Sequence, residues 1–375
     1  MAVTQPFLLF APCAPGLEPL LLAEVRAVGG VRPKEVPGGV EMEANEHVLG
    51  RCLLELGLAI DVRVRLGTFY APSFDAVIDE TSKLDWNRLI GPGQGVEIRA
   101  SARRSRLMHT GALEQRVYQG IKNAVGSLAS SESEAPWRVF ARNEKDRMSL
   151  SLSLAGEALH RRGYRLVTGK APLREDLARA LLQLSGWDPT TKLLDPFCGS
   201  GTILIEGARW ARRIPPGWNR SFHLERSPIF DPDRWKKIRD RLEGEILEAA
   251  PAPIAGGDRD PGALDATRQN AERAGVELEL EQAPLGKASC IEKLAGGTGM
   301  WVSNPPFGVR VQGGPGLRPL YQTIGNRFAE LGEDWRLGLL VHDPKLAHAT
   351  GLPLESRALL DHGGRKTRVF ASPTR

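Results

Sequence analysis

The alternation of strands and helices in the second half of the chain most constrains its fold. A strand is expected at 192–195 and a helix at 201–213; a second helix spans 260–275, and apolar strands follow at 298–303 and 337–342. This alternation is typical of a mainly parallel, doubly wound α/β sheet, a Rossmann-like fold. The carboxyl ends of such strands meet at one edge of the sheet, where ligands bind.

The first strand runs into the segment Asp195–Thr202, which contains Phe197, Gly199 and Gly201. The two glycines allow a tight turn and close backbone approach to a ligand. A dinucleotide site would need a third glycine at the position of Leu204, and a phosphate-binding P-loop would need lysine where Thr202 stands. We therefore predict a phosphate-free cofactor with a nucleoside, S-adenosyl-L-methionine.

A carboxylate for the ribose hydroxyls is expected at the end of the next strand, and Asp258 lies there. The neighbouring Arg259 is included in the predicted cofactor site. Asp260 precedes Pro261, a pattern that favours a helix N-cap, so Asp258 is the preferred cofactor contact.

The segment Asn304–Phe307 follows another apolar strand and should lie at the same edge. The side-chain oxygen of Asn304 and the carbonyl of Pro305 can accept both hydrogens of an exocyclic amine, while Phe307 can stack on its ring. Holding the amine in this way directs its lone pair at a methyl donor, largely by orientation. The alternative interpretation is a plain proline-rich turn. A base would have to be flipped or single-stranded to reach the site.

The first half of the chain is predicted to be α+β. Helices are expected at 17–28, 46–56 and 110–125, with strands at 62–69, 96–101 and 148–154. A chain of 375 residues fits two or three domains, and we place a linker near 159–170.

Basic residues gather where the strand at 96–101 meets the following helix. Between Arg99 and Lys122 the only acid is Glu114, and the cations include Arg103, Arg104 and Arg106. Such a patch suits a polyanion such as RNA, and the alternative is a solvated helix face. The four cysteines are scattered and no paired histidine motif occurs, so we expect free thiols, no metal site and a cytoplasmic protein. No apolar run is long enough to span a membrane.

Several segments together resemble the THUMP-domain RNA guanine-N2 methyltransferases over nearly the whole chain. They are Leu159–Arg165, Ala171–Glu175, Leu194–Thr202 and Ser303–Gly308, with Arg103–Leu107 and His109–Ala112 similar to the THUMP segment. The segments Leu317–Tyr321 and Gly325–Asn326 are similar to the bacterial branch that acts on large-subunit ribosomal RNA.

The resemblance implies a ferredoxin-like domain at 1–65, a THUMP RNA-binding domain at 66–158 and a methyltransferase domain at 159–375. It adds Pro172 and Leu173 to the border of the cofactor site and His109 to the RNA-binding residues. It implies N2-methylation of a guanine in ribosomal RNA. The alternatives are tRNA guanine methylation and a non-catalytic RNA-binding or assembly factor.

Two positions depart from the family pattern. Pro284 stands about where the family often has an acid for the cofactor adenine, and Val309 stands where it has glutamate after the prolines. Either adenine recognition would then depend on backbone groups or the affinity for the cofactor would be lower, while stacking on Phe307 is retained.

Overall fold

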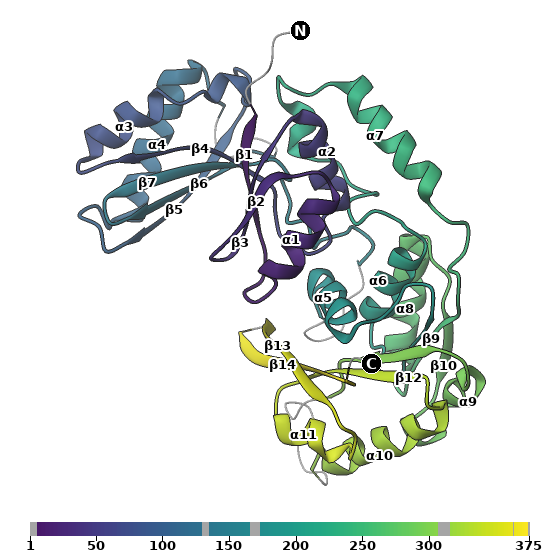
Figure 1. Cartoon of the computed structure of the whole chain (residues 1–375). Coiled ribbons are helices and arrows are strands. Elements are labelled where there is room, and N and C mark those ends of the chain that lie inside the picture. The colour runs from purple at the N-terminus through teal and green to yellow at the C-terminus, as the bar shows by residue number, and fades with distance from the viewer. Residues whose placement is uncertain (1–5, 130–134, 166–172, 307–315, 363, 374–375) are drawn as a thin grey trace. The chain divides into compact units, whose positions relative to one another are not determined.

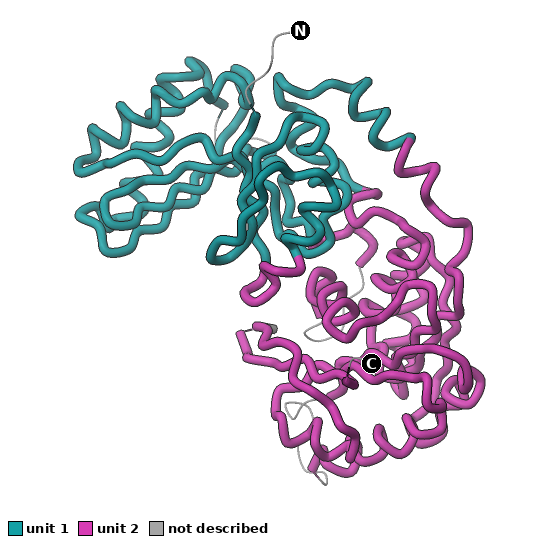
Figure 2. The backbone as a smooth tube through the Cα atoms, viewed as in Figure 1, with its two compact units in different colours: residues 1–13, 21–159, 220–240 teal, residues 14–20, 160–219, 241–375 magenta. Residues whose placement is uncertain are grey.

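The computed structural model describes residues 6–129, 135–165, 173–306, 316–362 and 364–373. They fold into two compact units, shown in teal and magenta in Figure 2. Unit 1 comprises residues 1–13, 21–159 and 220–240, and unit 2 comprises 14–20, 160–219 and 241–375. Each unit contains one seven-stranded sheet.

The sheet of unit 1 has the order β2-β3-β1-β4-β7-β6-β5. Its strands are β1 (Phe7–Pro12), β2 (Val31–Val36), β3 (Gly39–Ala44), β4 (Arg63–Tyr70), β5 (Val96–Arg103), β6 (Trp137–Glu144) and β7 (Arg147–Ser153). Only β5 and β6 pair in parallel within the described part of this sheet. The predicted division at 65/66 remains a prediction, although β4 continues across it.

The helices of the N-terminal half are α1 (Glu18–Ala27), α2 (Glu46–Glu55), α3 (Phe74–Ser82) and α4 (Thr110–Val125). α4 has the predicted bounds, because Leu113, Val117 and Ile121 form a buried stripe at helical spacing. Its N-cap is His109, whose Nδ1 accepts the N–H of Ala112 at 3.0 Å.

Unit 1 also includes residues 220–240, which come from the second half of the sequence. The short 3₁₀ helix η2 (His223–Arg226) places Leu224 N–H 3.0 Å from the carbonyl of Leu154. Ser227, directly after η2, donates to the carbonyl of Leu89 at 2.8 Å, and both groups are buried. The ring of Trp137 packs edge-on against His223. Sequence reasoning gave no hint of this return.

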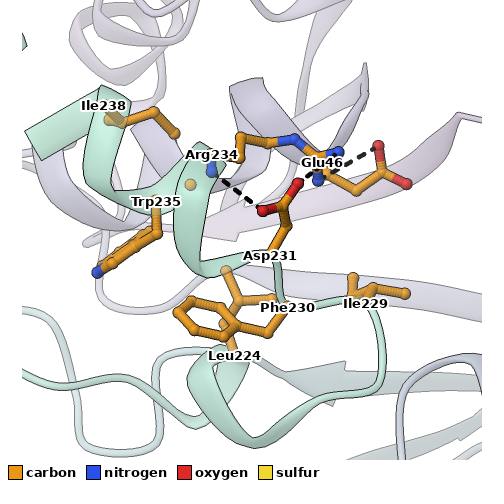
Figure 3. Close-up of a pocket in the computed structure, with 9 residues that line it drawn as sticks. Glu46, Leu224, Ile229, Phe230, Asp231, Arg234, Trp235 and Ile238 are labelled. Atoms are coloured by element: carbon orange, nitrogen blue, oxygen red, sulfur yellow. Dashed lines mark hydrogen bonds and ion pairs between the residues drawn. The ribbon is translucent and has the colours of Figure 1, made fainter.

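α7 (Pro232–Glu245) follows, and its first turns line a hollow in unit 1 (Figure 3). Trp235, Phe230 and Ile238 supply its apolar wall. Arg234 reaches both Asp231, at 3.4 Å, and Glu46 of α2, at 4.0 Å. None of the predicted site residues lines this hollow.

The sheet of unit 2 has the order β10-β9-β8-β11-β12-β14-β13. Its strands are β8 (Lys192–Asp195), β9 (Ile254–Asp258), β10 (Glu279–Gln282), β11 (Gly299–Ser303), β12 (Trp335–Val341), β13 (Glu355–His362) and β14 (Arg365–Ala371). The first five are parallel, while β14 is antiparallel to both neighbours. The predicted doubly wound α/β fold is confirmed, and the antiparallel hairpin at its end is an addition.

Helices cover both faces of this sheet in Figure 1. One face carries α5 (Glu175–Ser185), α6 (Thr202–Ala211) and α8 (Pro261–Ala274), and the other carries α9 (Cys290–Leu294), α10 (Arg318–Phe328) and α11 (Pro344–Ala349). On the second face, Tyr321 and Ile324 of α10 share one buried apolar cluster with Trp301 of β11 and with Leu337 and Leu339 of β12. Gly325 is required there, because a Cβ atom would lie 1.9 Å from the carbonyl of Thr350.

All four cysteines are buried and free, as expected. Within the described residues no helix is both long and apolar enough to cross a membrane.

Residues 220–240 should be needed for the stability of unit 1. A fragment of residues 1–159 loses the hydrogen bonds to Leu154 and Leu89 and uncovers Trp137, and each lost hydrogen bond costs about 0.5–1.5 kcal/mol. We expect this fragment to melt at a lower temperature than the same fragment joined by a flexible linker to residues 220–240. Circular dichroism measures both transitions. Identical melting temperatures would contradict this role. Ser227→Ala in the fusion, which removes the side-chain hydrogen bond to the carbonyl of Leu89, is the control that should reduce the gain.

Candidate functional site

The predicted cofactor turn lies at the point where the strand order of unit 2 reverses. β8 pairs with β9 on one side and with β11 on the other. The helices that follow β8 and β9, α6 and α8, lie on one face of the sheet, and α10, which follows β11, lies on the other. Ligands bind at the carboxyl ends of strands at such a switch point. Asp195, Asp258 and Ser303 are the last residues of these three strands.

A hydrogen bond joins the two predicted halves of the site. The hydroxyl of Ser303 donates to Asp195 Oδ1 at 2.5 Å, and Trp301 Nε1 donates to the same hydroxyl at 2.8 Å. The Asp195 carboxylate also accepts the N–H of Phe197 at 3.0 Å. Because Ser303 directly precedes Asn304, the start of the cofactor turn and the start of the substrate segment are held by one buried carboxylate.

Burial raises the pKa of Asp195 to about 7, although the hydrogen bonds from Ser303 and Phe197 act in the opposite direction. The negative charge of nearby Asp258 adds to this increase in pKa. Asp195 is 1% exposed, so its carboxylate lies inside the protein, where it holds the backbone of the turn through the N–H of Phe197.

The amides of Cys198, Gly199 and Gly201 in the turn are bonded within the protein. The N–H of Cys198 donates to the carbonyl of Gly257 at 3.0 Å, and that of Gly199 donates to Asp258 Oδ2 at 3.0 Å. Gly201 N–H donates to the carbonyl of Cys198 at 2.8 Å. A phosphate cradle presents such amides to its anion. Their internal bonding therefore disfavours a phosphate site, in line with the sequence-based argument.

α8 fixes the turn from the other side, through residues that sequence reasoning missed. Thr267 Oγ1 donates to the carbonyl of Gly199 at 2.7 Å, and Asn270 Nδ2 donates to that of Ser200 at 3.1 Å. Both side chains are fully buried. A polar pair three residues apart on a helix otherwise patterned for the core was the available signal.

Gly199 and Gly201 differ in what surrounds them. Both have positive φ, +55° and +84°. A Cβ at Gly201 would lie 2.6 Å from the Thr267 side chain, so this glycine serves packing. A Cβ at Gly199 would meet no atom of the described residues within 4 Å. The space above Gly199 is therefore where a ligand can approach the backbone.

Asp258 has capacity left for a ligand. Each of its oxygens accepts one backbone N–H, from Gly199 and from Asp260, both at 3.0 Å. A carboxylate oxygen has two acceptor sites, so one on each oxygen remains. Asp260 caps α8 by accepting from Gly262 N–H at 2.9 Å, which confirms the N-cap prediction. Arg259 is exposed.

The remaining predicted cofactor residues are placed as follows. Thr202 is buried and begins α6, and Leu173 is buried beside Arg165, which donates to its carbonyl at 2.6 Å. Pro172 lies outside the described residues, and so does Phe307 of the predicted substrate segment. Pro284 caps the short helix η3 (Leu285–Lys287).

Asn304 carries an unsatisfied acceptor. Its Oδ1 is buried and finds no donor among the described residues. Leaving such an atom unpaired costs about 1–3 kcal/mol, which a ligand N–H could recover. Pro305 beside it is buried, and Pro306 is exposed.

On the basic surface, Arg103, Arg104, Arg106 and His109 are all exposed. The guanidinium of Arg106 is 3.4 Å from Asp146, whereas neither Arg103 nor Arg104 has an ion-pair partner within the described ranges. No cluster of metal-binding side chains occurs among the residues that the structure describes.

Comparison with known proteins defines the class. Residues 162–359 match the family model described as "RMKL-like, methyltransferase domain", and residues 8–60 match the "RlmL ferredoxin-like domain". The chain belongs to the RMKL-like methyltransferase family. This confirms the predicted methyltransferase class, its S-adenosylmethionine type of cofactor and the ferredoxin-like N-terminal domain.

Curated relatives include the ribosomal RNA large subunit methyltransferases K/L of Methylococcus capsulatus and Vibrio parahaemolyticus. The first is 33% identical over 99% of this chain and 51% of its own length, and the second is 35% identical over 84% and 46%. The chain thus spans about half the length of the curated relatives it matches.

Solved structures show the same fold over the full chain. SMU.472 complexed with SAH is 26% identical with a TM-score of 0.88, covering 100% of this chain and 99% of that one. A possible methylase from Clostridium difficile 630 is 30% identical with a TM-score of 0.87, covering 99% of both chains.

Gly199→Ala should weaken cofactor binding more than folding. The new methyl group would enter the open space over the turn, where overpacking costs about 1–3 kcal/mol, or roughly 5- to 150-fold in affinity. Gly275→Ala is the matched control, because Gly275 has φ +68° and equally open surroundings at the end of α8. Calorimetry with S-adenosylhomocysteine measures the affinities. Equal affinities of the two variants would contradict this placement.

Asp195→Asn should change how stability depends on pH. Because the pKa of wild-type Asp195 is higher in the folded than in the unfolded chain, its contribution to the free energy of unfolding falls as pH rises from about 4 to about 7. Asparagine does not titrate. The melting temperature of the variant minus that of the wild type should therefore rise across this window and level off above it. Calorimetric scans without cofactor test this, and a difference independent of pH would contradict it.

Proposed function

We propose that the protein transfers a methyl group from S-adenosylmethionine to the exocyclic N2 amino group of a guanine in large-subunit ribosomal RNA. The observation that carries this proposal is the buried, unpartnered Oδ1 of Asn304 within the described residues, beside the bonded cofactor turn. The ribosomal RNA methyltransferase relatives support the substrate class, which in turn implies a cytoplasmic site of action. The THUMP assignment of residues 66–158 belongs to the same proposal.

In the proposed reaction, Asn304 Oδ1 and the Pro305 carbonyl accept the two N–H groups of the guanine amine. They orient the nitrogen lone pair toward the methyl donor, and Phe307 supplies a stacking surface. The cofactor supplies an electrophilic methyl group on a sulfonium. The guanine nitrogen would take this methyl group as the sulfonium becomes a neutral thioether, and one N–H would give its proton to solvent water. The N–H groups would become more acidic as the new bond forms, so Asn304 Oδ1 and the Pro305 carbonyl would hold them more strongly. No strong base is needed, and most of the rate would come from the orientation of the amine.

On the cofactor side, Asp258 would accept the ribose hydroxyls on its free lone pairs. Asp195, Phe197, Gly199, Gly201 and Thr202 would form the turn against which the cofactor lies, bordered by Pro172, Leu173 and Arg259. Backbone groups near Pro284 would contact the adenine, because Glu281 is already bonded to Ser289 Oγ at 2.8 Å and Cys290 N–H at 2.7 Å.

The reaction is tested by incubating the protein and S-adenosylmethionine separately with unmodified ribosomal RNA, tRNA and DNA. Nuclease digestion and mass spectrometry then identify the methylated base. N2-methylguanosine in large-subunit ribosomal RNA is the expected product. Methylation confined to tRNA or DNA would overturn the proposal. So would the absence of any methylated base although the protein binds S-adenosylmethionine.

Asn304→Ala should lower turnover about 100-fold or more, because a poorly held amine loses its alignment with the methyl donor. Cofactor affinity should stay close to that of the wild type. Single-turnover kinetics and calorimetry measure the two quantities. Asn219→Ala, an exposed position of the same unit, is the control that should change neither. Turnover like wild type in Asn304→Ala would refute the role of this side chain.

A further inference from the structure

The hairpin turn between β6 and β7 is bonded to the arginine-rich loop after β5. Lys145 N–H donates to the carbonyl of Arg103 at 3.2 Å, and Arg106 N–H donates to Asp146 Oδ1 at 2.6 Å. Asp146 N–H donates in turn to Ser105 Oγ at 3.1 Å. The two segments lie far apart in sequence, with a separation of 40 between Arg106 and Asp146, yet they form one surface.

The same turn reaches the end of β4. Ala71 N–H donates to the carbonyl of Asp146 at 2.8 Å, and Tyr70 lies directly opposite Arg147 in the β4–β7 ladder. Residues opposite each other in such a ladder have side chains about 5 Å apart. Tyr70 therefore stands beside Arg147, at the edge of the cationic loop.

Tyr70 is 53% exposed, and so is Met108 in the arginine-rich loop. An aromatic ring of this exposure on a strand end contributes little to the core. With Arg147 beside it and the other cations on the same surface, it is suited to stack on a base of an RNA whose phosphates these cations neutralise. The cations of this surface are Arg103, Arg104, Arg106, Lys145 and Arg147, and all are exposed.

One carboxylate lies in the hydrogen-bonded turn, that of Asp146, and its side chain is 17% exposed. It accepts the N–H of Arg106 and forms an ion pair with the guanidinium of the same residue. Glu144, the nearest acid along β6, pairs with Arg142 at 2.6 Å. Glu144 also lies opposite Arg147 and Arg103 in the β6–β7 and β5–β6 ladders. Because the five cations outnumber Asp146 and Glu144, the surface keeps a net positive charge.

Two of these cations have an uncommon backbone. Arg104 has φ +52° and Lys145 has φ +53°, in the left-handed region that favours glycine and asparagine. Each such residue costs about 1–2 kcal/mol of strain. Long cationic side chains at both positions point to a use for them on the surface.

We infer that Tyr70, Arg103, Arg104, Lys145 and Arg147 form a binding site for single-stranded RNA, in which an unpaired base stacks on Tyr70. This inference rests on the proposed function. It specifies that unit 1 binds a single-stranded part of the RNA substrate. A paired duplex offers no free base face to Tyr70, so the site discriminates in favour of loops and single-stranded ends.

The test is equilibrium binding of the full chain to a fluorescein-labelled, unstructured oligo(U) RNA and to a duplex of equal length, over a range of salt concentrations. Tyr70→Ala should weaken binding of the single strand about 5-fold or more, as expected when one base has no ring to stack on, and leave the salt slope unchanged. Tyr70→Phe should bind like wild type. Lys145→Ala with Arg147→Ala should reduce the slope by about 0.7 for each phosphate that the variant leaves unneutralised.

Val31→Ala and Lys34→Ala are the controls, since both positions are exposed on β2 of the same unit. They should bind like wild type. Wild-type affinity in Tyr70→Ala, or an equal loss for single strand and duplex, would overturn the inference. Because binding is measured without methyl transfer, such a failure leaves the proposed reaction standing. Failure of methyl transfer with intact Tyr70-dependent binding would instead overturn only the reaction.

Discussion

The hydrogen bond between Ser303 and Asp195 is the interaction on which the site depends. It joins the ends of β8 and β11, the two strands between which the sheet order of unit 2 reverses. One carboxylate thereby fixes the first amide of the cofactor turn and the residue before Asn304. A methyl donor and an acceptor must be aligned to within a fraction of an ångström for transfer. A buried bond shared by both loops meets that requirement better than two independent loops would.

This arrangement buries an ionisable group. Because Asp195 is 1% exposed, its negatively charged form is poorly solvated, and the pKa of its carboxyl group is raised. Around it the turn is over-determined by Gly257, Asp258, Thr267 and Asn270, which between them bond its amides and carbonyls. Within the described residues the space above Gly199 is open, so a cofactor without phosphates can approach the backbone there.

Much of unit 2 could be predicted from sequence, because its signals are local. Gly186 and Gly275 end helices in the left-handed conformation, Asp260 caps α8, and apolar runs mark β8, β11 and β12. The hydrogen bonds of Thr267 and Asn270 to the turn were missed, because they join residues about 70 positions apart, and the spacing of the two polar residues on α8 does not identify their partners. The return of residues 220–240 to unit 1 was missed for the same reason.

The N-terminal half shows the same limit. The helix at 110–125 was predicted because its apolar stripe is regular, whereas the unbroken sheet from β2 to β5 follows from pairings between distant strands, such as β4 with β7. The roles of Pro172 and Phe307, which lie outside the described residues, stay predictions.

A double-mutant cycle on cofactor binding tests the central claim most directly. The affinity for S-adenosylhomocysteine is measured by calorimetry for wild type, Ser303→Ala, Asp195→Asn and the double variant. If the bond between Ser303 and Asp195 holds the cofactor turn, Ser303→Ala should weaken binding although Ser303 is not a predicted cofactor contact. The double variant should then bind no more weakly than Asp195→Asn alone. Wild-type affinity in Ser303→Ala, or losses that add independently, would contradict the account.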